Sequence, residues 1–162
     1  MPLILWNIFV TNLSNIVTAP LKIHGGEFVI TIINMVKVLL IDDDEDLLEM
    51  MTLMLRSHGM DVISLNDGTM LYHALAERLP DILIMDVFLG NSDGRNLCRA
   101  LKESKGYTGF PVFLYSAGDL SQASVAESKA DQFFRKPFEM SLLIDRIHNS
   151  VSSNQQPTLA TG

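Results

Sequence analysis

The stretch VKVLLI, residues 36–41, decides the fold, and Asp42 and Asp43 follow it directly. A short, largely apolar run of this kind is typical of a strand that is buried on both faces of a sheet. An apolar stripe at helical spacing follows over residues 45–58 and stops before Gly59, which predicts a helix that ends there. A buried strand followed by a helix is the first unit of an alternating α/β pattern.

The same strand-then-helix unit recurs along the chain. We expect further strands over 60–65, 81–85, 111–115 and 131–135, and further helices over 69–79, 95–103, 120–128 and 139–151. Five consecutive units predict an α/β fold with one five-stranded, doubly wound parallel sheet, because parallel neighbours need crossover helices. In such sheets the ligand site lies at the carboxyl ends of the strands.

Polar side chains follow the predicted strands at that edge of the sheet. Asp42 and Asp43 follow the first strand, Asp86 the third, Ser116 the fourth and Lys136 the fifth. Each residue alone has an ordinary interpretation as a helix start, a cap or a surface cation. Together they are expected to form one site, with three carboxylates, a hydroxyl and an ammonium at one edge of the sheet. Crowded carboxylates repel one another unless a cation is present, and oxygen ligands suit Mg²⁺. A carboxylate can also act as a nucleophile and form an aspartyl-phosphate.

Four stretches carry a resemblance to a known family. They are KVLLIDDDEDLL (37–48), DILIMDVFLGNSDG (81–94), PVFLYSAG (111–118) and ADQFFRKPF (130–138). As a set, they resemble the receiver domain of bacterial two-component response regulators over residues 35–150. The resemblance implies a flavodoxin-like (βα)5 receiver fold.

The resemblance also assigns the acidic residues. It implies that Asp86 is the phosphoacceptor. It implies a Mg²⁺ site made of Asp42, Asp43, Asp86 and the backbone carbonyl of Phe88. Phosphoryl transfer needs little more than positioning and neutralisation of charge, which this set of ligands can support.

The remaining site residues are implied in the same way. Ser116 and Lys136 bind the phosphoryl group, and the Lys136–Pro137 peptide bond is cis. In the family, Ser116 moves toward the phosphoryl group, and an aromatic side chain, here Phe133, turns inward. The face formed by the fourth helix, the fifth strand and the fifth helix then changes shape. Phe133 lacks the hydroxyl that a tyrosine would bring, and for Phe134 we expect plain core packing.

Three positions depart from the common family pattern or bear on the lifetime of the phosphoryl group. Gly90 stands where the loop after the acceptor usually has proline, which predicts a more mobile loop. Phe88 and Gly118 lie two residues after Asp86 and Ser116, and these positions flank the path of the hydrolytic water in the family. A bulky apolar Phe88 is expected to shield the acyl phosphate.

The function that this resemblance implies is a phosphorylated signalling switch. A sensor histidine kinase or a phosphotransfer protein supplies the phosphoryl group, and the altered face binds a target protein or supports a phosphorylation-dependent dimer. With no output domain after residue 150, output is expected through protein contacts in a stand-alone receiver. One alternative is a docking module that is never phosphorylated. A second is an Asp-nucleophile phosphohydrolase, but such enzymes want an acid at the position of Phe88, so we do not expect an enzyme.

The distribution of charge along the chain favours protein partners over nucleic acid. Residues 1–34 hold one cation and one anion, and residues 151–162 hold no charge, so residues 35–150 carry the whole net charge of −7. This acidic balance argues against nucleic-acid binding. Cys98 is the single cysteine and excludes an intrachain disulfide, which fits a reducing, cytoplasmic location.

The flanks are expected to lie outside the working domain. Residues 1–34 are interpreted as a leader, and residues 151–162 as a disordered polar tail. The leader has a poor match to a membrane span and no basic start of a secretory signal, so no membrane insertion is expected. It is either an extension upstream of a natural start at Met35 or an arm that touches a membrane or a partner.

Two further side-chain predictions concern the core. Cys98 is expected to be buried on its helix. The methionines of the first predicted helix, Met50, Met51 and Met54, are expected to fill the core.

Overall fold

The structure is a computed structural model of the 162-residue chain, and it describes residues 16–23, 26–33, 35–107 and 109–154. The chain divides into two compact units, Met1–Met35 and Val36–Gly162. The larger unit contains the predicted α/β fold, and each unit is described here by itself.

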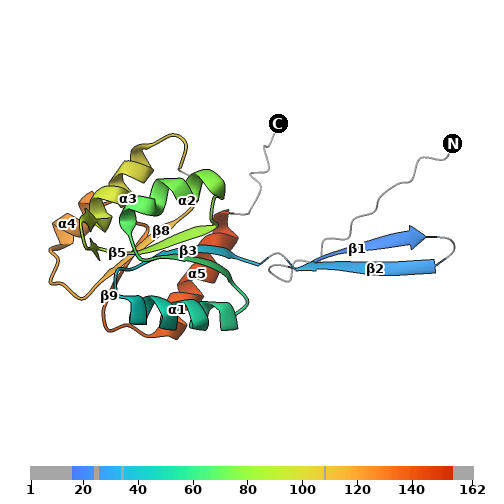
Figure 1. Ribbon diagram of the computed structural model, residues 1–162. Helices are drawn as coiled ribbons and strands as arrows, with labels where there is room; N and C mark the ends of the chain where they lie inside the picture. Colours follow the sequence, from blue (N-terminus) through green and yellow to red (C-terminus); the bar gives the residue numbers. More distant parts are fainter. Residues whose placement is uncertain (1–15, 24–25, 34, 108, 155–162) are drawn as a thin grey trace. The chain divides into compact units, whose positions relative to one another are not determined.

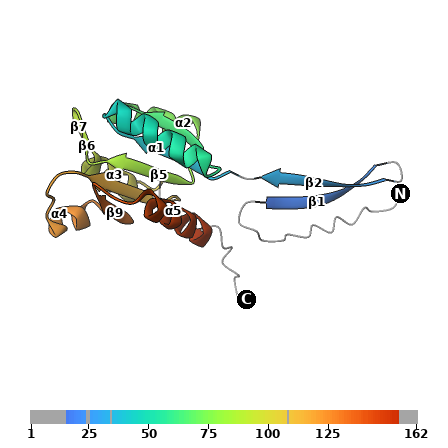
Figure 2. The ribbon, with the colours of Figure 1, turned by 90° about the horizontal axis from the view of Figure 1, so that it is seen from below.

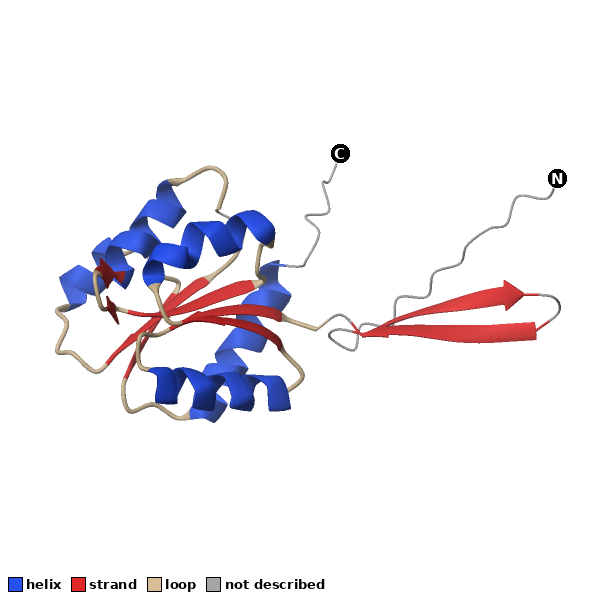
Figure 3. Cartoon of the chain, viewed as in Figure 1, coloured by secondary structure: helices blue, strands red, loops and turns tan. Residues whose placement is uncertain are grey.

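A five-stranded sheet forms the centre of the larger unit, with the strand order β4-β3-β5-β8-β9 and parallel pairing throughout. The strands are β3 (Lys37–Ile41), β4 (Asp61–Leu65), β5 (Ile82–Asp86), β8 (Val112–Ser116) and β9 (Gln132–Arg135). Figure 1 and Figure 3 show the strands side by side with helices above and below them. The prediction of a doubly wound parallel sheet is confirmed.

In the described part of the chain, four helices connect consecutive strands of this sheet and a fifth follows the last strand. They are α1 (Glu45–Ser57), α2 (Leu71–Glu77), α3 (Gly94–Glu103), α4 (Gln122–Glu127) and α5 (Met140–Asn154). Helices α1 and α5 pack on one face of the sheet, and α2 and α3 pack on the other. These four helices bury apolar residues against the sheet, so packing on both faces holds the strand ends in place, whereas no residue of α4 is buried.

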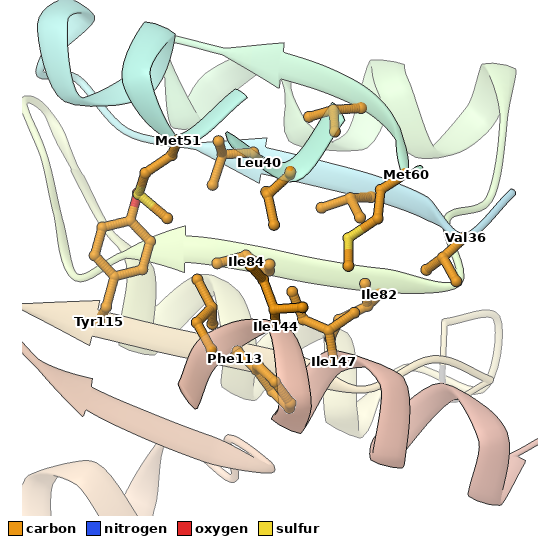
Figure 4. Close-up of a cluster of buried hydrophobic side chains, with 14 of the residues drawn as sticks. Val36, Leu40, Met51, Met60, Ile82, Ile84, Phe113, Tyr115, Ile144 and Ile147 are labelled. Carbon is orange, nitrogen blue, oxygen red and sulfur yellow. The ribbon is translucent and has the colours of Figure 1, made fainter. Parts of the chain in front are cut away.

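Successive side chains along each strand point to opposite faces of the sheet, so the core has two halves, one on each face. Leu40 and Ile84 belong to the cluster under α1 and α5, whereas Leu39 and Leu83 belong to the cluster under α2 and α3. Successive strand residues face opposite sides, and the parallel register pairs Leu40 with Ile84. Figure 4 shows the first cluster, with the strands facing α5.

The loops differ from prediction in two places. Between β5 and α3, where a loop is predicted, β6 (Phe88–Leu89) and β7 (Ser92–Asp93) form a short antiparallel hairpin. Gly90, in its turn, has a φ of 58°, a left-handed conformation that glycine adopts easily. The predicted helix 69–79 begins instead as a 3₁₀ turn, η1 (Gly68–Met70), because the Asp67 side chain accepts a hydrogen bond from the Thr69 amide.

The chain ends also extend beyond the predicted elements. Helix α5 continues to Asn154, so residues 151–154 of the predicted tail are helical. In the smaller unit, β1 (Ile16–Ile23) pairs with β2 (Gly26–Ile33) in an antiparallel hairpin, as Figure 2 also shows. Both strands lie within residues 1–34, the segment that is interpreted from the sequence as a leader. Among the described residues, no helix combines the length and apolar character needed to cross a membrane.

The methionine prediction holds only in part. Met51 is fully buried and Met54 is half-buried, but Met50 is 47% exposed, so its assignment to the core is wrong. The buried stripe of α1 runs through Leu48, Met51 and Leu55. Met50 lies off this stripe because neighbouring positions on a helix point in different directions.

Cys98 is fully buried on α3, as predicted, and burial raises the pKa of its thiol to about 12. Because the thiolate is the reactive form, we expect the native protein at pH 8 to react with a thiol reagent such as Ellman's reagent only after global unfolding. Absorbance would show slow labelling in buffer and complete, fast labelling in urea. A Leu53→Cys variant is the positive control, since Leu53 lies exposed on α1. Rapid labelling of native Cys98 would contradict the burial.

Candidate functional site

The carboxyl edge of the sheet brings together the three predicted carboxylates. Asp42 follows β3, Asp86 ends β5, and these two strands are parallel neighbours in register. Asp42 and Asp86 are buried, whereas Asp43 is exposed. One carboxylate oxygen of each of the three residues lies within 4.8 Å of the others. The sheet therefore forms the acidic cluster that the strand ends predict.

Local hydrogen bonds fix the loops that carry these side chains. Asp42 Oδ1 accepts a hydrogen bond from the Asp44 amide at 2.9 Å, and Asp44 caps α1 by accepting from the Leu47 amide. The Phe88 amide donates to Asp86 Oδ2 at 2.9 Å. Such short-range turns fix one oxygen of each carboxylate close to the backbone that carries it.

Lys136 joins two of the carboxylates. Its Nζ lies 3.1 Å from Asp42 Oδ2 and 3.2 Å from Asp86 Oδ1. The backbone supports this position, because the Lys136 amide donates to the Ser116 carbonyl at 2.8 Å. The predicted cis peptide bond at Lys136–Pro137 is present.

Ser116 is buried at the end of β8, beside β5 in the sheet. Its Oγ accepts a hydrogen bond from the Gly118 amide at 3.1 Å. This contact uses an oxygen lone pair, so the hydroxyl proton remains for another acceptor. Phe133 is half-buried beside the cluster under α2 and α3, and its switch role stays a prediction. Phe134 is buried in the core, as predicted.

The Asp86 carboxylate lies in an unfavourable electrostatic environment. Burial raises the pKa of Asp86, the Lys136 ammonium partly offsets this, and the nearby Asp42 charge raises the pKa further. Within the described part of the chain, the buried Asp86 Oδ1 has no hydrogen-bond partner, although the Lys136 charge is close. One oxygen of Asp86 therefore has no hydrogen-bond donor among the described residues and faces the Lys136 ammonium.

These residues fit a hard divalent cation. Asp42, Asp43 and Asp86 offer only oxygen ligands, and Mg²⁺ is commonly held by few carboxylates together with water. Among the described residues, Oδ1 of Asp86 accepts no hydrogen bond and has the Lys136 ammonium 3.2 Å away, so this oxygen can serve as the Asp86 ligand to a cation. The Phe88 carbonyl remains a predicted ligand.

Two glycines allow close approach at this edge. Gly94 begins α3 and donates its amide to the Val87 carbonyl at 2.8 Å, and a Cβ atom built on it would overlap the Asp86 carbonyl. A Cβ atom on Gly118 would lie 2.7 Å from Cε2 of Phe88. The Phe88 ring therefore rests against Gly118, next to Ser116, while 52% of Phe88 stays exposed.

The structure adds one residue that the sequence interpretation missed. Tyr115 is fully buried at the end of β8, and its hydroxyl donates to Asp42 Oδ2 at 2.8 Å. Burial and the Asp42 carboxylate raise the pKa of this hydroxyl, so it stays protonated. The available signal was a tyrosine in a strand buried on both faces, because a buried phenol needs a hydrogen-bond partner.

Comparison with known proteins agrees with this geometry. Residues 38–148 match the family model of the response regulator receiver domain. The chain is similar to the DNA-binding response regulator MtrA of Mycobacterium tuberculosis, with 32% identity over 120 residues, which cover 73% of this chain and 51% of MtrA. It is 34% identical over 131 residues to protein RcaC of Microchaete diplosiphon, covering 78% of this chain and 20% of RcaC.

A solved structure shows the same fold. The crystal structure of a candidate response regulator from Chloroflexus aurantiacus superposes with a TM-score of 0.68 at 30% identity. The match covers 74% of this chain and 99% of that chain. By contrast, the chain spans about half the length of the MtrA relatives.

Proposed function

Because the chain belongs to the response regulator receiver domain family, we propose that it is a signalling switch phosphorylated on Asp86. The observation that carries the proposal is the buried Asp86 carboxylate, whose Oδ1 accepts no hydrogen bond from the residues that the structure describes and faces the Lys136 ammonium at 3.2 Å. A sensor histidine kinase or a phosphotransfer protein is the proposed donor. An Asp86 oxygen forms the new O–P bond while the P–N bond of the donor breaks and its electron pair returns to the imidazole.

The other residues of the site would neutralise and bind the transferred group. Asp42, Asp43, Asp86 and the Phe88 carbonyl would hold Mg²⁺, which neutralises charge on the phosphoryl oxygens when bound. Lys136 would form an ion pair with one phosphoryl oxygen, and the Ser116 hydroxyl would donate a hydrogen bond to another.

We propose that the signal leaves through the face of α4, β9 and α5. Ser116 would move toward the phosphoryl group, and Phe133 would turn inward. The α4 helix has six residues and none of them is buried, which supports a shift of this element. The altered face would bind a target protein or a second phosphorylated copy.

We propose residues 35–150 as the receiver domain, with residues 1–34 outside it. The acidic charge of residues 35–150 supports protein rather than nucleic-acid partners, and a cytoplasmic location is proposed with it. MtrA is a DNA-binding protein, but this chain spans about half of its length. We do not propose that the chain is an Asp-nucleophile phosphohydrolase, because the apolar Phe88 occupies the position where such an enzyme needs a general acid.

Incubation of the full chain with acetyl phosphate and Mg²⁺ tests the proposal. Intact-mass spectrometry should show a gain of one phosphoryl group, and a chelator should prevent it. A chain that gains no mass under these conditions would refute the switch and favour a docking module. Equal mass gain with the chelator would refute the Mg²⁺ site.

Phe88 is expected to prolong the life of the phosphorylated state. Its ring lies against Gly118, whose amide donates a hydrogen bond to Ser116 Oγ, so the ring lies beside Ser116 at the same edge of the sheet as Asp86. We expect Phe88→Asn to shorten the half-life about tenfold, which corresponds to about 1.4 kcal/mol in the barrier to hydrolysis. The loss of phosphate after removal of acetyl phosphate, followed by mass spectrometry, measures this.

The matched control is Leu79→Asn. Leu79 is also 52% exposed, but it lies beyond α2, away from the carboxyl edge of the sheet. This variant should keep the wild-type half-life. If Phe88→Asn loses phosphate no faster than the wild type, the ring does not shield the acceptor.

A further inference from the structure

Tyr115 contacts two charged residues of the site, Asp42 and Lys136. It is the residue before Ser116 on β8, and it is one of the largest fully buried side chains. Figure 4 shows it at one end of the core cluster, with its ring pointing toward Met51 of α1. A tyrosine at this position combines an apolar ring with one polar atom that must be satisfied.

The hydroxyl of Tyr115 orients Asp42. It donates to Asp42 Oδ2 at 2.8 Å, while the Asp44 amide donates to Asp42 Oδ1 at 2.9 Å. Because β5 lies between β3 and β8, this contact reaches past one strand of the sheet. Both carboxylate oxygens are thus restrained, which leaves Asp42 little freedom to rotate.

The ring of Tyr115 supports Lys136. The Lys136 Nζ lies 4.7 Å from the ring centroid, within the range of a cation–π contact. The same Nζ donates to Asp42 Oδ2 at 3.1 Å. Phe138 packs edge-on against the same ring, with the two ring centroids 5.8 Å apart, which holds the Tyr115 ring in place.

We propose that Tyr115 is a positioning residue of the phosphoryl-transfer site, orienting Asp42 through its hydroxyl and Lys136 through its ring. The inference rests on the proposed function, because it assigns work to Asp42 and Lys136 in that reaction. The hydroxyl then governs the affinity for Mg²⁺, and the ring governs the rate of transfer once Mg²⁺ is bound. Partners that orient metal ligands typically contribute tenfold or more to metal affinity.

Two substitutions separate the two contributions. Tyr115→Phe removes the hydroxyl and keeps the ring, whereas Tyr115→Leu removes both. Tyr72→Phe is the matched control, because Tyr72 lies exposed on α2 and loses the same hydroxyl away from the site. The Kd for Mg²⁺ is measured on the unphosphorylated full chain from amide NMR shifts of Phe88 and Gly118. The rate of phosphorylation by acetyl phosphate is then measured at saturating Mg²⁺.

We expect Tyr115→Phe to raise the Kd for Mg²⁺ about tenfold and to keep the wild-type rate at saturating Mg²⁺. Tyr115→Leu should raise the Kd and also slow the reaction several-fold at saturation. A purely structural role would lower thermal stability without this split between affinity and rate. If Tyr115→Leu does not fold, Tyr115→Phe still decides the role of the hydroxyl.

The outcomes distinguish this inference from the proposed function. An unchanged Kd in Tyr115→Phe overturns the inference, even if the wild type is phosphorylated. If Tyr115→Phe raises the Kd for Mg²⁺ but the wild type accepts no phosphoryl group, the proposed function alone is overturned. A wild type that binds no Mg²⁺ overturns both.

Discussion

Asp86→Asn is expected to abolish phosphoryl uptake from acetyl phosphate completely. The amide keeps the shape of the side chain but lacks the nucleophilic carboxylate oxygen that would form the bond to phosphorus. Asp42 and Asp43 remain at the same edge of the sheet in this variant. The experiment therefore also shows whether a neighbouring carboxylate can accept the phosphoryl group in place of Asp86. Intact-mass spectrometry with Mg²⁺ present measures the uptake.

The matched control for this substitution is Asp81→Asn. Asp81 precedes β5, at the opposite end from Asp86, and accepts a hydrogen bond from the Lys37 amide at 2.8 Å. Asp81→Asn should take up the phosphoryl group at the wild-type level. Residual uptake by Asp86→Asn would move the acceptor to another residue and refute the assignment of Asp86.

The same variant tests the electrostatics of the site. Burial raises the pKa of Asp86 above its ordinary value of 3.8. Its contribution to stability is therefore fully present below that value and is lost as the pH rises through the higher pKa of the folded state. Asparagine removes this loss, so without Mg²⁺ the variant should resist urea better than the wild type at pH 7 and no better at pH 3. An equal advantage at both pH values would contradict the raised pKa.

Gly94→Ala is expected to lower the free energy of unfolding by about 1–3 kcal/mol, the usual cost of overpacking a filled site. The added Cβ atom would overlap the Asp86 carbonyl and lie 3.2 Å from Cα of Val87. Both neighbours are backbone atoms, so they can yield only if the segment after β5 shifts. That shift would displace the acceptor, and we expect phosphorylation to slow as well.

The control is Gly109→Ala, because a Cβ atom at Gly109 meets nothing within 4 Å. Urea unfolding should leave its stability near that of the wild type. Wild-type stability in Gly94→Ala would show that the loop between β5 and α3 tolerates displacement.

The sequence pattern predicts the sheet well because its inner strands β3, β5 and β8 are buried on both faces and produce continuous apolar runs. The strand ends then predict the acidic cluster. The β6–β7 hairpin is different, since a strand of two residues is too short to show a period. Met50 was misplaced because composition alone does not show which helix positions face the sheet.

Tyr115 shows a second limit of sequence interpretation. Its partner Asp42 belongs to the end of β3, which lies two strands away in the sheet and 73 positions away in the chain. Local periodicity shows that Tyr115 is buried, but the identity of its hydrogen-bond partner depends on the strand order. Contacts of this kind become visible only once the topology is known.

The exposed character of α4 has a consequence for how such a domain diversifies. Because none of its six residues is buried, substitutions on α4 remove no core packing and should cost little folding free energy. The helix surface is therefore free to vary among descendants of this chain while the sheet and the acidic cluster stay unchanged. Selection for a new binding partner can act on α4 without first compensating a loss of stability.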